Sequence, residues 1–199
     1  MNPSRRIALI SLLLALAAPV AQAGDSATEI SGVRFEPKLQ LGGQALVLNG
    51  VGLRARSILK GYAAGLYLGH RAGAVLQVLA QDGPKRLQMR MLLDVPVAEF
   101  VKAFHKGVDR NTPEDQHAAL AERMGQFDAQ IQPLGKVRSG DTVNLDYLPS
   151  QGMLMSHNGR VIGAPIPGAD FYSAILLIFI GDKPVDDKLK LGLLGQAAG

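Results

Sequence analysis

The sequence contains no cysteine and no tryptophan, and only 5% of its 199 residues are aromatic. Without cysteine the chain forms no disulfides or cysteine-ligated metal sites and performs no thiol chemistry. Because aromatic side chains are scarce, aliphatic residues must supply most of the core. No long run of basic residues occurs, which argues against a nucleic-acid-binding surface. Packing alone must therefore hold this chain together.

The sequence also lacks the motifs of common catalytic sites. It has no Gly-rich phosphate-binding loop, no HExxH run and no Ser-His-Asp arrangement. The histidines are not spaced like metal ligands, and we expect them on the surface; they are His70, His105, His117 and His157. We therefore expect no cofactor and no metal, and we assign no catalytic residue.

The first 23 residues have the three parts of a secretory signal. Arg5 and Arg6 give a positive start, residues 7–17 form an apolar stretch, and Ala21-Gln22-Ala23 is a small-residue cleavage site. The apolar stretch is shorter than the about 20 residues that span a bilayer. We expect cleavage after Ala23, a periplasmic or secreted location, and no stable membrane anchor.

Residues 24–199 are expected to form a single domain, because their number suffices for one sizeable core. The formal net charge of the whole chain is +4, and two of these charges belong to Arg5 and Arg6. The remaining balance is near neutral. The charge of the domain therefore gives no support for nucleic acid or an anionic surface as a partner.

Hydrophobic periodicity predicts mainly strands in the first half and a mixture in the second. The predicted strands are 29–35, 44–48, 53–59, 61–69, 86–93, 142–147, 153–156 and 160–162, the last two joined by an Asn158-Gly159 turn. The predicted helices are 74–80, one from Pro96, one after Pro113, 171–180 and 186–194. This order indicates an α+β fold, with helices packed on one face of a largely antiparallel sheet.

The segment from Gly50 to Tyr62 carries the best candidate for a binding site. Gly50 and Gly52 favour a sharp backbone turn just before Arg54. With a turn near Ile58, Arg54 and Tyr62 project from neighbouring strands on the same face. A guanidinium binds a carboxylate in bidentate fashion, and a phenol adds one donor. The alternative is that Arg54 pairs with a structural acid and Tyr62 is only half-buried.

Four segments in their order along the chain resemble the chalcone isomerase superfamily, in particular its bacterial exported branch. They are Gly50-Val-Gly-Leu-Arg54, Tyr62-Ala-Ala-Gly-Leu-Tyr67, Gly83-Pro-Lys-Arg86 leading to Asp94-Val95, and Ile180-Gly-Asp-Lys-Pro-Val185. The resemblance covers roughly residues 30–195. It implies an open-faced sandwich, in which a large antiparallel sheet carries a layer of helices and ligands bind in the cleft between them.

The resemblance also implies roles for individual residues. Arg54 matches the arginine that contacts the flavonoid in the plant enzyme and the carboxylate in the fatty-acid-binding branch. Tyr62 matches a tyrosine of that branch, where the enzyme has threonine. The tyrosine that the enzyme places beside its substrate falls on Phe100, and its asparagine falls near Gly107, so the resemblance implies that both polar contacts are missing. These matches favour a binding protein over an isomerase.

Apolar residues on the facing strand and helices are candidates to line the cleft, although core packing is the more common role for each. They are Met89, Met91, Phe100, Phe104, Phe171, Ile175 and Leu176. Tyr172 matches a polar cleft residue of the enzymes and can present a hydroxyl. The basic side chains of Lys102, Lys106 and Arg110 lie at helical spacing, which is typical of a solvated helix face.

Three functions remain open from the sequence. The leading hypothesis is an exported binding protein for a fatty acid or similar amphiphilic carboxylate, held by Arg54 and Tyr62. The first alternative is an intramolecular lyase or isomerase, in which Arg54 stabilises negative charge on a phenolic substrate. The second is a periplasmic assembly partner of another protein, with a cleft filled by its own side chains.

Overall fold

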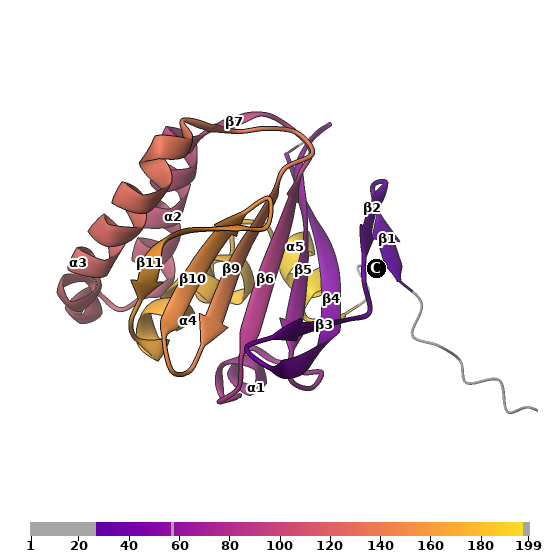
Figure 1. Ribbon diagram of the computed structural model, residues 1–199, viewed down its shortest axis with the longest axis horizontal. Helices are drawn as coiled ribbons and strands as arrows, with labels where there is room; N and C mark the ends of the chain where they lie inside the picture. The colour runs from indigo at the N-terminus through magenta and orange to yellow at the C-terminus, as the bar shows by residue number, and fades with distance from the viewer. Residues whose placement is uncertain (1–26, 57, 197–199) are drawn as a thin grey trace, which may run out of the picture.

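The computed structural model describes residues 27–56 and 58–196 (Figure 1), and the expected signal segment lies outside these ranges. The strands are β1 (Thr28–Ile30), β2 (Val33–Phe35), β3 (Lys38–Leu41), β4 (Gln44–Arg56), β5 (Leu59–Leu68), β6 (Lys85–Met91), β7 (Val95–Pro96), β8 (Lys136–Val137), β9 (Thr142–Leu148), β10 (Gly152–His157) and β11 (Arg160–Ile166). The helices are α1 (Val75–Leu79), α2 (Val97–Asn111), α3 (Glu114–Ile131), α4 (Ala169–Ile180) and α5 (Asp187–Leu193), with a 3-10 turn, η1 (Gln132–Leu134).

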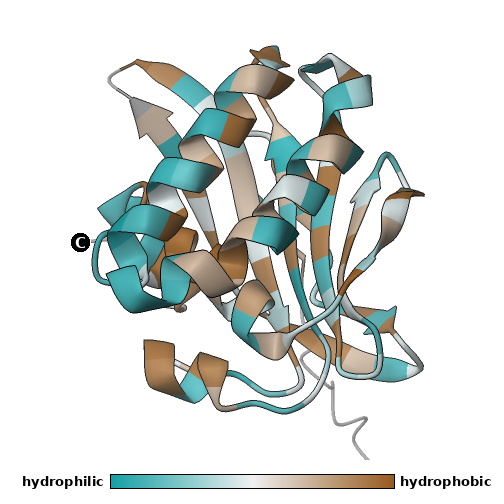
Figure 2. Ribbon diagram, turned by 90° about the vertical axis from the view of Figure 1, so that its left-hand side faces the viewer, coloured by the Kyte–Doolittle hydropathy of each residue, from teal (hydrophilic) through white to brown (hydrophobic). Residues whose placement is uncertain are grey.

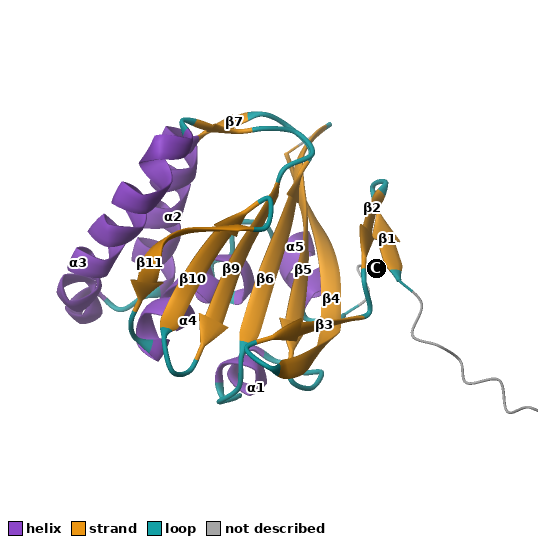
Figure 3. Cartoon of the chain, in the orientation of Figure 1, coloured by secondary structure: helices purple, strands orange, loops and turns teal. Residues whose placement is uncertain are grey.

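Seven strands form one curled antiparallel sheet in the order β11-β10-β9-β6-β5-β4-β3. The helices α2 to α5 lie on one side of it (Figure 3). This arrangement confirms the predicted α+β class with a large antiparallel sheet and a helical layer. No helix within the described ranges has both the length and the apolar character to cross a membrane.

The main core lies between the sheet and the helices. Along β6, Leu87, Met89 and Met91 are at most 2% exposed and face this core, as their alternation with polar residues predicts. Helix α4 is the most apolar element, and eight of its twelve residues are buried. The two long helices α2 and α3 show apolar residues interspersed with hydrophilic ones (Figure 2), as expected for helices with one buried side.

A smaller core occupies the opposite side of the sheet. Phe35, Leu46, Leu48, Ala63 and Tyr67 form it, and the β1–β2 hairpin packs against it. The prediction of one strand over residues 29–35 was wrong, because Ser31 and Gly32 adopt positive φ angles of 52° and 76° and reverse the chain. A tight two-residue turn of this hand matches the twist of paired strands.

The two predicted strands at 44–48 and 53–59 are one long strand. β4 continues through Gly50 and Gly52, and both residues pair with β5. The pairing shifts register between Leu48 and Gly50, but the strand does not turn there. The expected sharp turn is therefore absent from this segment. The glycines serve a different purpose: a Cβ atom on Gly52 would lie 2.6 Å from the carbonyl oxygen of Leu189, and one on Gly50 would overlap that of Gly192. Helix α5 rests directly on the β4 backbone.

Candidate functional site

Arg54 and Tyr62 are directly paired across β4 and β5, and Tyr62 also pairs with Met91 on β6. Residues directly opposite in an antiparallel pair project to the same face of the sheet. The juxtaposition predicted from their positions in the sequence is therefore confirmed. The face is the one covered by helices, because Tyr62 and Met91 pack in the main core.

Both side chains line a cavity of about 300 Å³ between the sheet and the helices. Its walls are almost entirely apolar and come from β6, α2, α4 and the segment after α4; they include Met91, Phe100, Phe104, Ile178, Phe179 and Val185. Several residues around its opening are exposed, among them Leu59, Leu93, Glu99 and Ala103. The cavity thus has an apolar interior, a polar end at Arg54 and Tyr62, and a mouth open to solvent.

Arg54 has a protein partner inside this site, and Tyr62 is half-buried, so the alternative expected from the sequence, in which Arg54 pairs with a structural acid, is borne out. Its Nη1 lies 3.2 Å from Oδ2 of Asp186 and donates at 3.2 Å to the carbonyl oxygen of Ala55. The other carboxylate oxygen of Asp186 accepts a hydrogen bond from the backbone of Leu189 and caps α5. Within the described ranges, Nε and Nη2 of Arg54 donate to no other residue. The guanidinium is therefore oriented by the protein and retains free donors.

The hydroxyl of Tyr62 is also free of hydrogen bonds to the residues that the structure describes. Burial raises the pKa of Tyr62 well above its ordinary value, the positive charge of Arg54 opposes this shift, and the negative charge of Asp186 adds to it. The phenol is accordingly neutral at physiological pH and acts as a hydrogen-bond donor. Together, Arg54 and Tyr62 place unused donors on the wall of a largely apolar space.

Comparison with protein families decides the evolutionary relationship. A family model described as chalcone isomerase-like matches residues 27–195. The chain belongs to the chalcone isomerase-like family. Among solved structures, the Arabidopsis thaliana fatty-acid binding protein is similar over 85% of this chain and 96% of its own, with a TM-score of 0.66 and 16% sequence identity. No curated protein matches the sequence.

Two positions distinguish this chalcone isomerase-like chain from what the resemblance implies for the plant isomerase. The resemblance places Phe100 at the position of the tyrosine, and its ring, which carries no hydroxyl, lines the cavity. The resemblance places the asparagine near Gly107, where an added Cβ would lie 2.6 Å from Cγ2 of Ile178 on α4. The close approach of α2 to α4 leaves no room for an amide side chain at Gly107 itself.

The other candidate residues separate into cavity and core. Phe100 and Phe104 line the cavity, whereas Met89 is fully buried and contacts only a minor void of about 20 Å³ beside it. Tyr172 lies outside the cavity: its hydroxyl donates to the carbonyl oxygen of Leu145 at 3.3 Å, and its ring stacks on Tyr147. The side chains of Phe171, Ile175 and Leu176 are core residues, and Lys102, Lys106 and Arg110 are exposed on α2.

The sequence did not indicate two acidic residues of the site. Asp186 lies 132 positions from Arg54, so no local pattern could pair them. Its place just before the predicted last helix was a signal for capping, but not for contact with the cleft. Glu99 lies at the mouth, but in the sequence it is one of several polar residues of α2, and nothing in the pattern distinguishes it from them. Within the described ranges, no group of three or more His, Asp or Glu side chains is arranged to hold a metal ion.

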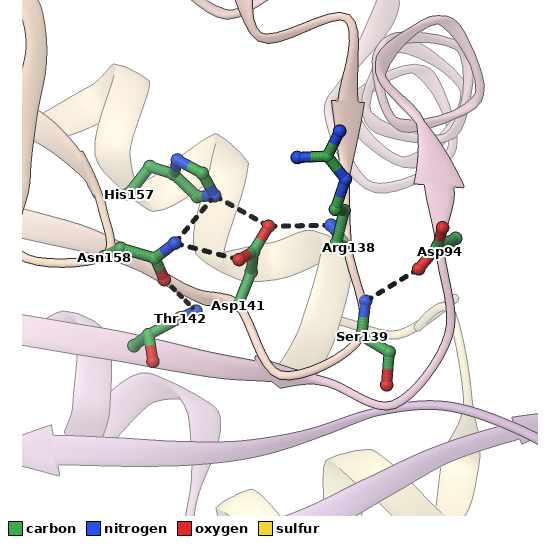
Figure 4. Close-up of polar contacts among 7 residues, drawn as sticks. All are labelled: Asp94, Arg138, Ser139, Asp141, Thr142, His157 and Asn158. Atoms are coloured by element: carbon green, nitrogen blue, oxygen red, sulfur yellow. Dashed lines mark hydrogen bonds and ion pairs between the residues drawn. The ribbon is translucent and has the colours of Figure 1, made fainter.

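A polar network holds the loop between β8 and β9, next to the end of β6 (Figure 4). Asp141 accepts hydrogen bonds from Nδ2 of Asn158 at 2.8 Å, from the backbone of Arg138 at 2.7 Å and from Nε2 of His157 at 2.8 Å. The backbone carbonyl of Asp141 accepts from Met91, which lines the cavity. These bonds, led by that from Asn158, lower the pKa of Asp141 to about 2. The ionised side chain of Asp141 therefore holds this loop through three hydrogen bonds, and the backbone carbonyl of the same residue holds the end of β6.

This network predicts a specific acid sensitivity. Because the pKa of Asp141 is lower in the folded protein than its ordinary value of 3.8, its contribution to stability is complete above about pH 4 and is lost as the pH falls towards 2. We expect Asp141→Asn to unfold more easily at pH 7, by on the order of 1 kcal/mol. The difference should shrink between pH 4 and pH 2. Urea unfolding of both proteins across this range measures it, and a difference that stays constant with pH would contradict the assignment.

Proposed function

We propose that this protein binds a fatty acid or similar amphiphilic carboxylate after export, with Arg54 and Tyr62 holding the acid group. The observation that carries the proposal is the pairing of these two side chains, both with unused donors, at the polar end of an apolar cavity. The fatty-acid binding of the Arabidopsis protein with the same fold gives independent support.

The chemistry of the two ends matches the two halves of such a ligand. Nε and Nη2 of Arg54 form the fork that takes both oxygens of a carboxylate, and the Tyr62 hydroxyl adds a third donor. Each charged hydrogen bond contributes on the order of 1.5–3 kcal/mol. The apolar walls supply further affinity at about 25 cal/mol for each Å² of hydrocarbon removed from water.

The cavity volume limits how much of a chain is enclosed. One water molecule takes about 30 Å³ in the liquid, and a methylene group also has a single heavy atom, so 300 Å³ holds on the order of ten heavy atoms. A longer chain would extend past the exposed Leu59 and Leu93 at the mouth. Two of these atoms are the carboxylate oxygens, so we expect affinity to rise with chain length up to about eight carbons and to level off beyond.

The alternatives receive less support. An isomerase of the plant type would lack the two polar contacts at Phe100 and Gly107. An assembly partner with a filled cleft would not have 300 Å³ of open space beside Arg54. The presence of Asp186 on Arg54 is compatible with the carboxylate proposal, because it occupies only one nitrogen of the guanidinium.

The proposal is tested by purifying the protein from its own cellular compartment, measuring it by native mass spectrometry, and identifying any extracted small molecule. A titration of the emptied protein with decanoate then compares wild type with Arg54→Ala. We expect the variant to bind about 10- to 100-fold more weakly, which corresponds to the loss of one or two charged hydrogen bonds.

The matched control is Arg90→Ala. Arg90 lies on β6 next to Met91 and therefore projects to the opposite face of the sheet, away from the cavity. This variant should bind decanoate as wild type does. Equal affinity of wild type and Arg54→Ala, or an empty native protein that also fails to bind added fatty acids, would refute the proposal.

A further inference from the structure

A second, smaller cavity lies around Lys85, at the other end of β6 from Met91. Its volume is about 100 Å³, and it is lined by residues of β6, β9, α4 and the loop after α1; those that carry the argument are Lys85, Tyr147, Ser173 and Asp82. Lys85 pairs with Tyr147 across β6 and β9, so both side chains lie on the helical side of the sheet. This cavity is separate from the proposed fatty-acid site, since the two share no lining residue.

Lys85 is an unusual residue for this position, because it is only 5% exposed. Its Nζ donates to the backbone carbonyl oxygen of Gln81 and lies 5.1 Å from the centre of the Tyr147 ring. Among the residues that the structure describes, no carboxylate forms an ion pair with it. A buried ammonium group is costly, and proteins normally pair such a charge directly. Here the negative charge of Asp82 at the edge of the cavity acts on Lys85 without forming an ion pair with it.

The walls of the cavity carry hydroxyl groups that can act as hydrogen-bond donors. The hydroxyls of Tyr147 and Ser173 make no hydrogen bond to the described part of the chain, and the Tyr172 hydroxyl is already used on Leu145. An ammonium group has three N–H donors. One donates to the carbonyl oxygen of Gln81 and one can point at the ring of Tyr147, so at least one donor remains unused. A small acceptor with negative charge would complete this set.

We propose that this cavity binds a small monovalent carboxylate of the size of formate or acetate, with Lys85 as its counter-ion and Ser173 and Tyr147 as hydrogen-bond donors. The volume of 100 Å³ corresponds to three or four heavy atoms at about 30 Å³ each. Asp82 is exposed at the edge of the cavity, and its charge disfavours a multiply charged anion such as phosphate.

The protonation of Lys85 makes the binding dependent on pH. Burial lowers the pKa of Lys85, and the charge of Asp82 partly opposes this effect. A bound carboxylate stabilises the ammonium form, so binding raises that pKa and is strongest while Lys85 is protonated. Affinity for acetate should therefore fall as the pH rises through the lowered pKa of Lys85.

The experiment uses the full mature chain with sodium acetate, sodium chloride and sodium phosphate as probes at constant ionic strength. Nitrogen-15 NMR of the lysine Nζ groups follows the site directly, and the melting temperature follows binding to the folded state. We expect acetate to shift the Lys85 resonance saturably and to raise the melting temperature more than chloride does. Lys85→Met should weaken acetate binding at least tenfold, whereas Lys106→Met, which changes an exposed lysine on α2, should not.

Three results would overturn the proposal. These are an acetate effect no larger than that of chloride, an equal effect in wild type and Lys85→Met, and stronger binding of phosphate than of acetate. If Lys85→Met does not fold, Ser173→Ala takes its place, and we expect it to weaken acetate binding severalfold with the Lys85 resonance still responsive. The fatty-acid titration is independent of these outcomes, because Arg54 and Tyr62 line the other cavity.

Discussion

Replacing Ala103 by tryptophan is expected to reduce fatty-acid binding below detection while the domain stays folded. Ala103 lies on α2, is exposed, and lines the cavity beside Phe100 and Phe104. An indole ring at this position would occupy much of the 300 Å³ that the ligand needs and would close the mouth. Since the alanine side chain is outside the core, the substitution should cost little stability.

Calorimetric titration with decanoate measures the effect, and circular dichroism with thermal unfolding checks the fold. Two control variants separate blocking from other consequences. Ala103→Ser keeps the cavity open. Leu76→Trp adds an indole on α1, where Leu76 is 79% exposed and does not line the cavity. Both control variants should bind decanoate with the affinity of the wild type. Because the chain has no native tryptophan, the new ring also reports by fluorescence whether ligand is near it. Normal binding by Ala103→Trp would show that the ligand does not use this cavity.

Replacing Gly50 by alanine is expected to destabilise the protein by about 3 kcal/mol or more, at the upper end of overpacking effects. The new Cβ would overlap the carbonyl oxygen of Gly192 and lie 2.7 Å from the backbone nitrogen of Gly195. These are backbone atoms, so no side-chain rotation relieves the clash. Helix α5 must move, and Asp186 at its start would then lose its position beside Arg54.

Urea unfolding and the melting temperature measure this loss, and we expect a decrease of about 6–12 °C for a chain of this size. Gly125→Ala is the matched control. Gly125 lies inside α3 without a positive φ, and a Cβ added there would meet no atom of the described residues within 4 Å. Alanine should therefore stabilise this helix by about 0.5–1 kcal/mol. If Gly50→Ala melts at the same temperature as wild type, the direct contact between β4 and α5 is not as close as described.

The sequence predicted the elements whose pattern is local. Alternation along β6 predicted its buried side, Asn158 and Gly159 predicted the β10–β11 turn with φ angles of 50° and 80°, and the shared parity of Arg54 and Tyr62 predicted their pairing. Each of these depends on residues a few positions apart, or on one turn. Periodicity carries such information directly.

Features that depend on distant contacts could not be predicted in the same way. The glycines of β4 suggested a backbone turn. The structure shows instead that they have no side chain because helix α5 packs directly against the strand at these positions. Likewise, Tyr172 had the right residue type for a cleft, yet the rotation of α4 directs its hydroxyl to Leu145. The partner of Arg54 comes from the far end of the chain, where no spacing rule applies.

The open mouth of the main cavity has a kinetic consequence. Leu59 is 60% exposed and Leu93 38% exposed at the rim, so an amphiphile can enter without any element of the fold moving aside. The association rate would then depend on how often ligand and protein meet by diffusion. The residence time would depend on how many methylene groups of the ligand are buried in the cavity. For the ligand proposed above, an open mouth of this kind favours rapid exchange over long retention.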